Sequence, residues 1–220
     1  METVSTYVLI HGAGSDAWLW HLVVPQLEEL GHVAIAVNLP CDDDAAGLRE
    51  YADTVLRTAG ELEEVILVAQ SLAGFAAPLV CDRRPVDLVV LVNAMVPMPG
   101  ETAGEWWANT GHIFPDPFDP VDVFLHDVSP SLVAEAANHV RRQSDTVFSD
   151  PLPLAKWPPV PTRSVACRDD RFFPIDFQRR VVRERLGIEP EEMPGGHLPA
   201  LARPQELVEL LEACRISASR

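Results

Sequence analysis

Short apolar runs, rich in β-branched and aliphatic residues, alternate along the chain with segments whose apolar residues recur at helical spacing. The runs have the composition of buried strands, and they span residues 7–10, 33–37, 65–69, 88–92, 162–167 and 189–193. The predicted helices between them span residues 18–30, 48–59, 71–82, 176–186 and 204–214. Because apolar strands alternate with helices, the pattern predicts an α/β fold, with a mostly parallel sheet of about six strands and helices on both faces.

The alternation stops between the fourth and the fifth predicted strands. This stretch holds 11 of the 20 prolines of the chain, and proline disfavours long helices and central strands. Large aromatic residues also gather there, namely Trp106, Trp107, Phe114, Phe118 and Phe124. We interpret residues 97–161 as a cap insertion of short helices and loops, with 131–144 as its clearest helix. Residues 1–96 and 162–220 would then form the core.

Charge and composition exclude several classes of partner. The formal net charge is −16, which argues against binding to nucleic acid or to an anionic membrane, since both need clustered cations. No apolar run approaches the ~18 residues of a membrane span, and no basic stretch followed by a long apolar run suggests a secretory leader. The four cysteines form no CxxC pair, so we expect free thiols, no zinc site and a cytoplasmic protein.

A serine stands where the third predicted strand turns into a helix, in the segment AQSLAG (69–74). Such a turn lifts a hydroxyl off the sheet, and the helix N-terminus behind it favours developing negative charge. The usual pattern is GxSxG, but here both glycines are replaced, by Ala69 and Ala73, and a glycine follows only at Gly74. From this segment alone, Ser71 is as well explained as a helix cap as it is as a nucleophile.

Glycines also follow the first predicted strand, in the segment HGAG (11–14). They allow the backbone to approach a ligand closely. Beside a nucleophile turn, the N–H groups of Ala13 and Leu72 would face a carbonyl oxygen as an oxyanion hole. The alternative is an ordinary strand-to-helix turn, and His11 is expected to be structural rather than catalytic.

Two further segments supply an acid and a base. Asp170 follows the fifth predicted strand, four residues before Pro174, and a carboxylate there can accept the Nδ1 proton of a histidine. Its neighbour Asp169 is the alternative acid. The candidate base is His197, in the glycine-rich segment GGHLP (195–199) between the last short strand and the last helix.

The order of these segments is more restrictive than any one of them. An oxyanion loop, a serine, an acid and a histidine follow one another, each at the carboxyl end of a predicted strand. Open parallel sheets bind ligands at that edge. We therefore predict a catalytic triad of Ser71, Asp170 and His197, with Ala13 and Leu72 as oxyanion donors.

With these segments in place, the chain resembles the α/β-hydrolase superfamily and, within it, the branch of plant methyl esterases and hydroxynitrile lyases. The resemblance is carried by VLIHGAGSDAWLW, EVILVAQSLAGF, DRFFPIDFQ and PGGHLPAL, and it covers nearly the whole chain outside residues 97–161. Lyases of that branch carry a threonine in the oxyanion loop and a lysine after the histidine. This chain has Gly12 and Leu198 at those positions, which favours ester hydrolysis.

The expected reaction is the hydrolysis of a small carboxylic ester through an acyl-enzyme on Ser71, and it requires no metal or organic cofactor. A hydroxynitrile lyase or a C–C bond hydrolase on the same triad is one alternative. A catalytically silent ligand-binding homologue is another, and it is suggested by Ala69 and Ala73, which replace the usual glycines of the nucleophile turn, or elbow. The expected partner is a small apolar ester, and a homodimer is left open. Aromatic residues of the insertion, together with Trp18, would either line an apolar pocket or pin the cap to the core.

Overall fold

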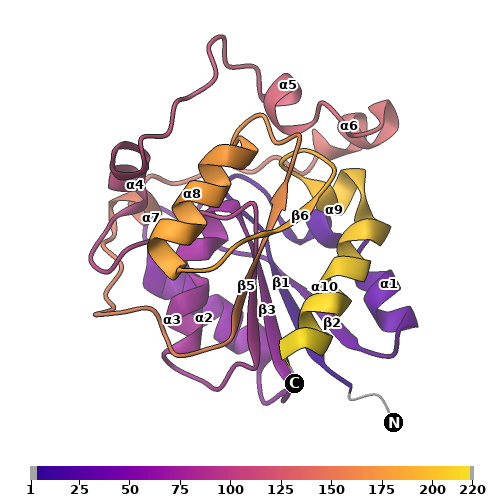
Figure 1. Cartoon of the computed structure of the whole chain (residues 1–220), viewed down its shortest axis with the longest axis vertical. Helices are drawn as coiled ribbons and strands as arrows, with labels where there is room; N and C mark the ends of the chain where they lie inside the picture. The colour runs from indigo at the N-terminus through magenta and orange to yellow at the C-terminus, as the bar shows by residue number, and fades with distance from the viewer. Residues whose placement is uncertain (1–3, 219–220) are drawn as a thin grey trace.

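The computed structural model describes residues 4–218 of the chain. Six strands form one sheet in the order β2-β1-β3-β4-β5-β6, and every neighbouring pair is parallel (Figure 1). The strands are β1 (Thr6–Ile10), β2 (Val33–Val37), β3 (Val65–Gln70), β4 (Leu88–Val92), β5 (Thr162–Cys167) and β6 (Glu191–Met193). The predicted α/β fold is thus confirmed.

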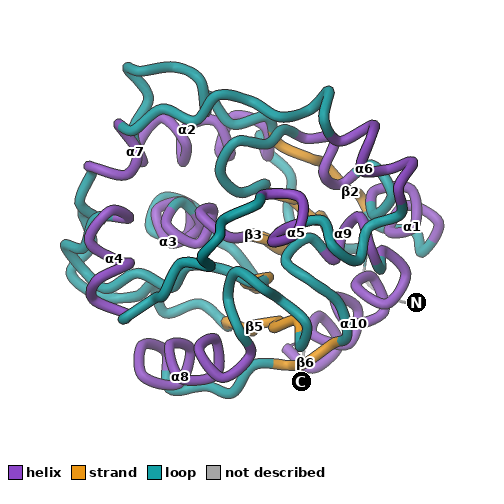
Figure 2. The backbone as a smooth tube through the Cα atoms, turned by 90° about the horizontal axis from the view of Figure 1, so that it is seen from above, coloured by secondary structure: helices purple, strands orange, loops and turns teal. Residues whose placement is uncertain are grey.

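Each strand contributes to two apolar cores, because successive side chains point to opposite faces of the sheet. In β1, Val8 and Ile10 belong to one core, and Tyr7 and Leu9 belong to the other. The helices that cover the sheet in the first core include α2 (Leu48–Ala59), α3 (Ala77–Cys81) and α8 (Ile175–Leu186). Those packed in the second are α1 (Val24–Glu29), α9 (Pro199–Ala202) and α10 (Pro204–Ala218). Figure 2 shows the two groups on opposite sides of the strands.

Prolines divide two of the predicted helices, 18–30 and 71–82. Each becomes a 3-10 turn followed by a short α-helix: η1 (Ala17–Trp20) with α1, and η2 (Ser71–Phe75) with α3. Pro25 and Pro78 lie in the first turns of α1 and α3. A proline has no N–H to donate to the preceding turn, so a new helix begins there.

Two predicted boundaries near the C-terminus also differ. The strand predicted over 189–193 begins only at Glu191, directly after Pro190, which has no N–H for the ladder with β5. The helix predicted over 204–214 continues to Ala218 as α10, and α9 precedes it.

The segment 97–161 is called the cap segment below. Its middle part, around residues 120–136, lies above the carboxyl ends of the strands, while its last residues run down one side of the molecule to the start of β5 (Figure 1). Within the described residues it adds no strand to the sheet. Its helices are α4 (Ala103–Thr110), α5 (Pro120–Phe124), α6 (Pro130–Ala136) and α7 (Thr146–Ser149). All are short, as the density of prolines predicted.

The helix predicted over 131–144 is wrong beyond α6. The Arg141 N–H donates to the Gly14 carbonyl over 2.9 Å. The Ser144 N–H donates to the Cys41 carbonyl over 2.7 Å. These main-chain groups bond to two core loops instead of to a preceding helical turn, so residues 141–144 follow the core loops and do not continue the helix.

Candidate active site

The turn between β3 and η2 presents Ser71 in a strained backbone conformation. Its φ is +51°, in the left-handed region that residues other than glycine rarely adopt. The Met95 N–H donates to the Ser71 carbonyl over 3.0 Å and so ties the turn to the loop after β4. This is the sharp strand-to-helix turn that raises a hydroxyl above the edge of a sheet.

The two alanines of this turn fit without crowding, whereas the following glycine is required. Ala69 and Ala73 are both buried in the core shared with α2 and α3. At Gly74, by contrast, an added Cβ would lie 1.9 Å from the Met95 carbonyl oxygen. Close approach of the backbone is therefore needed one position later than the GxSxG pattern implies.

Three predicted residues meet in one hydrogen-bonded chain at the carboxyl edge of the sheet. Ser71 Oγ lies 3.2 Å from His197 Nε2, and His197 Nδ1 lies 2.8 Å from Asp170 Oδ2. All three side chains are buried. Because a carboxylate only accepts, Nδ1 carries the proton shared with Asp170, and Nε2 is left to accept from the Ser71 hydroxyl.

The two adjacent aspartates have different partners. Asp170 Oδ1 accepts from the Phe172 and Phe173 N–H groups at 2.8 and 2.9 Å, which leaves Oδ2 facing His197. Asp169 Oδ2 instead accepts from the Gly195 N–H over 3.0 Å. The structure thus brings Asp170 to the histidine and Asp169 to the backbone of the histidine loop.

The predicted oxyanion donors, Ala13 and Leu72, both line a cavity above Ser71. Among the described residues outside helices and strands, no main-chain acceptor is found for the Ala13 N–H. The loop that carries Ala13 is held by the Gly12 N–H, which donates to Gln70 Oε1 over 3.0 Å. A Cβ on Gly12 would lie 2.5 Å from Gln70 Oε1 and 2.8 Å from the Ser71 Cβ, so only glycine fits there.

His11 is kept apart from the triad. Its Nε2 accepts from the Leu39 N–H over 3.1 Å, and its Nδ1 lies 2.8 Å from the Gly12 carbonyl oxygen. Burial lowers the pKa of His11 to about 4, so the ring is neutral and braces the loop. This agrees with the structural role expected for it.

The cavity above Ser71 has a volume of about 420 Å³. Its walls come from the core loops and from the cap segment, and none of the lining residues is Asp, Glu, Lys or Arg. Most of them are apolar, including Trp18, Leu72, Met95, Trp107, Phe124, Leu125, Phe148, Phe172, Leu198 and Leu201. The Phe124 ring centroid lies 5.3 Å from that of His197, so the cap segment reaches the histidine ring.

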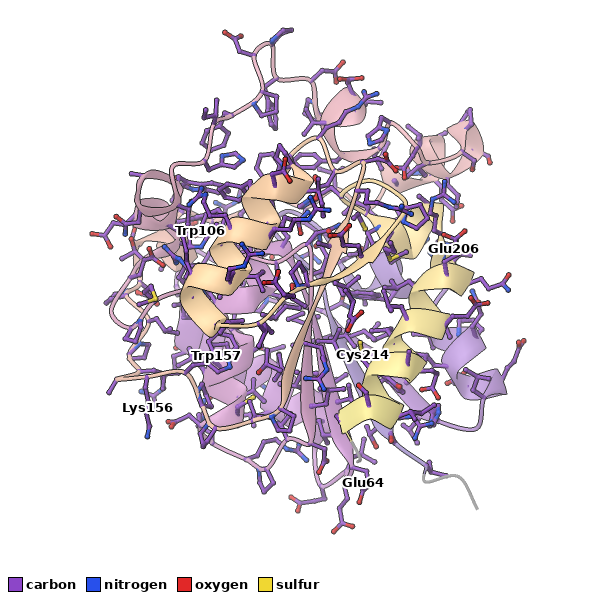
Figure 3. The ribbon with its side chains drawn as sticks, in the orientation of Figure 1. Glu64, Trp106, Lys156, Trp157, Glu206 and Cys214 are labelled. Carbon is purple, nitrogen blue, oxygen red and sulfur yellow. The ribbon has the colours of Figure 1, made fainter. Side chains whose placement is uncertain are left out.

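Three tryptophans, Trp18, Trp106 and Trp107, were expected either to line the pocket or to pin the cap segment to the core, and both roles occur. Trp18 and Trp107 line the cavity. Trp106, labelled in Figure 3, is fully buried where α4 meets α8, and its indole N–H donates to the Val96 carbonyl over 3.0 Å. Trp106 therefore pins the cap segment to the core, while the other two face the ligand space.

Sequence reasoning missed two polar residues that support the histidine loop. Asn93 Nδ2 donates to the Gly196 and His197 carbonyls, both over 3.1 Å. Gln70 Nε2 donates more weakly to the His197 carbonyl, over 3.4 Å. Both side chains lie at the carboxyl ends of buried strands. A polar residue at the end of an apolar run was the sequence signal that could have indicated them.

Other kinds of site are not seen in the described part of the chain. Across residues 4–218, no three His, Cys, Asp or Glu side chains come together in an arrangement that could bind a metal ion. No helix among them is long and apolar enough to cross a membrane.

The chain belongs to the alpha/beta hydrolase family, whose pattern it matches over residues 7–210. It is 28% identical to Methylesterase 7 of Arabidopsis thaliana over 253 aligned positions, which cover 93% of this chain and 94% of that protein. It is 23% identical to polyneuridine aldehyde esterase of Rauvolfia serpentina, with 93% of both proteins covered. The predicted resemblance to the methyl esterase branch is confirmed.

Solved structures support the same fold. A pyrethroid hydrolase from Sphingobium faniae JZ-2 superposes with a TM-score of 0.80 at 22% identity, covering 98% of both chains. A polyneuridine aldehyde esterase mutant superposes with a TM-score of 0.82 at 20% identity, covering 96% of this chain and 99% of the other. At these identities the likeness concerns the fold.

Proposed function

We propose that this protein is a serine hydrolase that cleaves a small neutral carboxylic ester through an acyl-enzyme. One observation carries the proposal: the hydrogen-bonded chain Ser71–His197–Asp170 opens into a mostly apolar cavity that no Asp, Glu, Lys or Arg lines. The esterase names of several relatives agree with this chemistry. Catalysis would need only protein groups, since acyl transfer to water requires acid–base chemistry and oxyanion stabilisation.

In the first half-reaction, His197 Nε2 takes the proton of the Ser71 hydroxyl while Oγ attacks the ester carbonyl. The carbonyl oxygen becomes an oxyanion that accepts from the N–H groups of Ala13 and Leu72, each worth on the order of 3 kcal/mol in the transition state. Asp170 stabilises the imidazolium and keeps its Nδ1 proton in place. His197 then protonates the leaving alkoxide, and the alcohol departs.

In the second half-reaction, water attacks the acyl group on Ser71. His197 again acts as the base, now toward water, and the oxyanion forms in the same hole. Collapse of this intermediate returns the proton from His197 to Ser71 Oγ and releases the carboxylic acid. The acid ionises near neutral pH, and no Lys or Arg lines the cavity to retain the carboxylate.

The character of the cavity indicates the substrate class. A volume of about 420 Å³ is within the usual range for small-molecule sites, roughly 300–1,000 Å³. Without a charged wall residue to pair with an ionic group, binding of a charged substrate would leave that charge uncompensated. A neutral ester with an apolar acyl or alcohol part therefore fits best.

The lyase alternative is disfavoured by the space around position 12. A threonine there would place its Cβ 2.5 Å from Gln70 Oε1, so the elbow would have to move. Leu198, which lines the cavity, adds an apolar surface where a lysine would supply a charge. Both positions favour acyl transfer over cyanohydrin cleavage.

A substrate panel tests the proposal. Purified protein is assayed with short-chain, aryl and methyl esters, with a cyanohydrin and with a C–C hydrolase substrate, beside Ser71→Ala as the blank. We expect ester turnover that disappears in Ser71→Ala. Cyanohydrin cleavage without ester turnover would replace the esterase by the lyase, and no turnover of any substrate would favour the silent homologue.

A further inference from the structure

Two side chains of the cap segment accept hydrogen bonds from glycine N–H groups that lie one residue from a proposed catalytic group. Asp127 Oδ2 accepts from the Gly196 N–H over 2.7 Å, next to His197. Gln143 Oε1 accepts from the Gly14 N–H over 3.0 Å, next to the oxyanion donor Ala13. Both bonds cross from the cap to the core, so the cap touches the two halves of the machinery separately.

We propose that Asp127 and Gln143 are positioning residues, through which the cap segment holds the base and the oxyanion hole in their working geometry. The inference rests on the proposed hydrolase function. It gives the cap a part in the chemical step, in addition to forming a wall of the cavity. Neither side chain needs to touch the reacting atoms.

The contact at Asp127 is closely fitted. A Cβ on Gly196 would lie 2.8 Å from Asp127 Oδ1 and 2.7 Å from His126 Nε2, so the glycine is what lets the cap approach. The adjacent His126 Nε2 bonds to the Asp169 carbonyl oxygen over 3.0 Å. Two consecutive cap residues thus hold the acid loop and the histidine loop together.

The histidine loop depends on this cap contact for one of its main-chain groups. The Gly195 N–H is bonded to Asp169, and the carbonyls of Gly196 and His197 are bonded to Asn93. Among the described residues, Asp127 is the acceptor of the Gly196 N–H. Without it, the residue before His197 loses its fixed partner.

Two further hydrogen bonds orient the side-chain amide of Gln143. Gln143 Nε2 donates to the Tyr51 hydroxyl and to the Ser144 carbonyl, both over 3.0 Å, which leaves Oε1 free to accept from Gly14. Tyr51 is buried in α2, so the amide is anchored to the rigid core. The Arg141 N–H donates to the Gly14 carbonyl, and both main-chain groups of Gly14 are therefore held by the cap.

Loss of these contacts should affect turnover more than substrate binding. A displacement of about 1 Å at a catalytic group can reduce a rate about 100-fold even when the substrate still binds. Asp127 does not line the cavity, so its loss leaves the walls intact. Removing it should therefore lower kcat for small and large esters alike, whereas loss of a wall residue raises KM for esters that reach that wall.

The test compares Asp127→Ala and Gln143→Ala with Arg142→Ala as the matched control. Arg142 also joins the cap to the core, through an exposed ion pair with Asp44 at 2.8 Å, but it contacts neither catalytic loop. Each protein is assayed for kcat and KM with p-nitrophenyl acetate and a longer ester. Labelling of Ser71 by a fluorophosphonate is followed in parallel, and thermal melting shows that each variant is folded.

We expect kcat and the labelling rate to fall roughly 10- to 100-fold in Asp127→Ala, with KM for the acetate ester changing less than about threefold. Gln143 also lines the cavity, so Gln143→Ala should lower kcat for the acetate ester in the same way and should in addition raise KM for the longer ester. Arg142→Ala should match the wild type. Asp127→Asn keeps an oxygen acceptor for Gly196, so it should recover most of the rate. Loss of rate in Arg142→Ala equal to that in Asp127→Ala would mean that any cap contact has this effect, which contradicts the proposal.

A second variant keeps the proposal testable if Asp127→Ala does not fold. Gly196→Ala forces the same contact apart from the other side, and a folded Gly196→Ala protein with wild-type kcat would overturn the inference. So would a folded Asp127→Ala protein that is labelled at the wild-type rate, or an Asp127→Asn protein as slow as Asp127→Ala. Failure of the wild type itself to be labelled would instead contradict the hydrolase function.

Discussion

The side-chain amide of Asn93 donates to the main-chain carbonyl of His197 over 3.1 Å. The same nitrogen reaches the Gly196 carbonyl, and Asn93 Oδ1 accepts from the Cys167 N–H over 2.8 Å. With a φ of +43°, Asn93 adopts a left-handed conformation that asparagine tolerates better than most residues. One buried side chain thus joins the ends of β4 and β5 to the loop of the proposed base.

Replacing Asn93 should therefore cost both stability and activity. Asn93→Ala leaves the Gly196 carbonyl and the Cys167 N–H without their Asn93 partner and the His197 carbonyl with only the weaker bond from Gln70. We predict a loss of about 2–4 kcal/mol in the free energy of unfolding. Urea titration followed by fluorescence measures this loss. Asn93→Asp should be no better, because a carboxylate opposes the carbonyls of Gly196 and His197. A loss below about 0.5 kcal/mol in Asn93→Ala would show that water replaces these bonds at no cost.

The elbow offers a matched pair of glycine and alanine exchanges. Ala73→Gly restores the usual pattern at a position where alanine already fits, so ester turnover should stay within about twofold of wild type. Gly74→Ala puts a Cβ 1.9 Å from the Met95 carbonyl, so it should displace the turn and abolish most turnover. Thermal melting and ester assays of the two variants check this. Equal turnover in both would contradict the assignment of the close approach to Gly74.

Asparagine variants of Asp169 and Asp170 show which of the two is the catalytic acid. Asp170→Asn should lower kcat by about four orders of magnitude, because its one oxygen stays with the Phe172 and Phe173 N–H groups. The NH2 group then faces His197 Nδ1 and favours the wrong tautomer of the imidazole. Asp169→Asn keeps an oxygen that can accept from the Gly195 N–H, so it should lower kcat much less. Steady-state kinetics with one ester decides between them. A larger loss in Asp169→Asn would make Asp169 the acid.

Acid should destabilise the fold through buried neutral histidines. Burial lowers the pKa of His11 to about 4, so the unfolded chain binds a proton near pH 6.5 that the folded chain binds only near pH 4. The contribution of His11 to the free energy of unfolding is therefore complete above pH 6.5. It is lost as the pH falls toward 4, by about 3 kcal/mol in all. Burial also lowers the pKa of His112, which adds a change of the same sign.

Denaturant titrations at pH 7 and pH 4.5 measure this dependence. His11→Gln cannot take up the proton, so its free energy of unfolding should fall less between the two pH values than that of the wild type. The same slope in both proteins would assign the acid sensitivity to other groups.

The strands and the order of the candidate residues could be predicted from the sequence for a simple physical reason. A strand buried on both faces is a run of apolar residues, and β1, β3 and β4 stand out as such runs. The residues that follow each run lie at the carboxyl edge, so Ser71 and Asp170 could be placed near one another before any contact was known.

The interrupted helices and the supporting residues of the site depend on contacts that periodicity does not carry. The predicted helix runs to residue 144, yet the Arg141 and Ser144 N–H groups bond to the loops at Gly14 and Cys41, which are far away in sequence. Asn93, Asp127 and Gln143 act through main-chain groups of distant loops, and no local motif marks such a partner. Gly196 likewise belongs to a recognisable GGH motif, but its need for glycine comes from the cap.

The measurement that tests the central claim most directly is covalent labelling of the intact protein by a fluorophosphonate, followed by peptide mass spectrometry. A serine activated by His197 and Asp170 should react within minutes and carry the adduct on the peptide that contains Ser71. Ser71→Ala and His197→Ala should stay unlabelled under the same conditions. A folded wild-type protein without an adduct, or with the adduct on another residue, would contradict a nucleophilic Ser71.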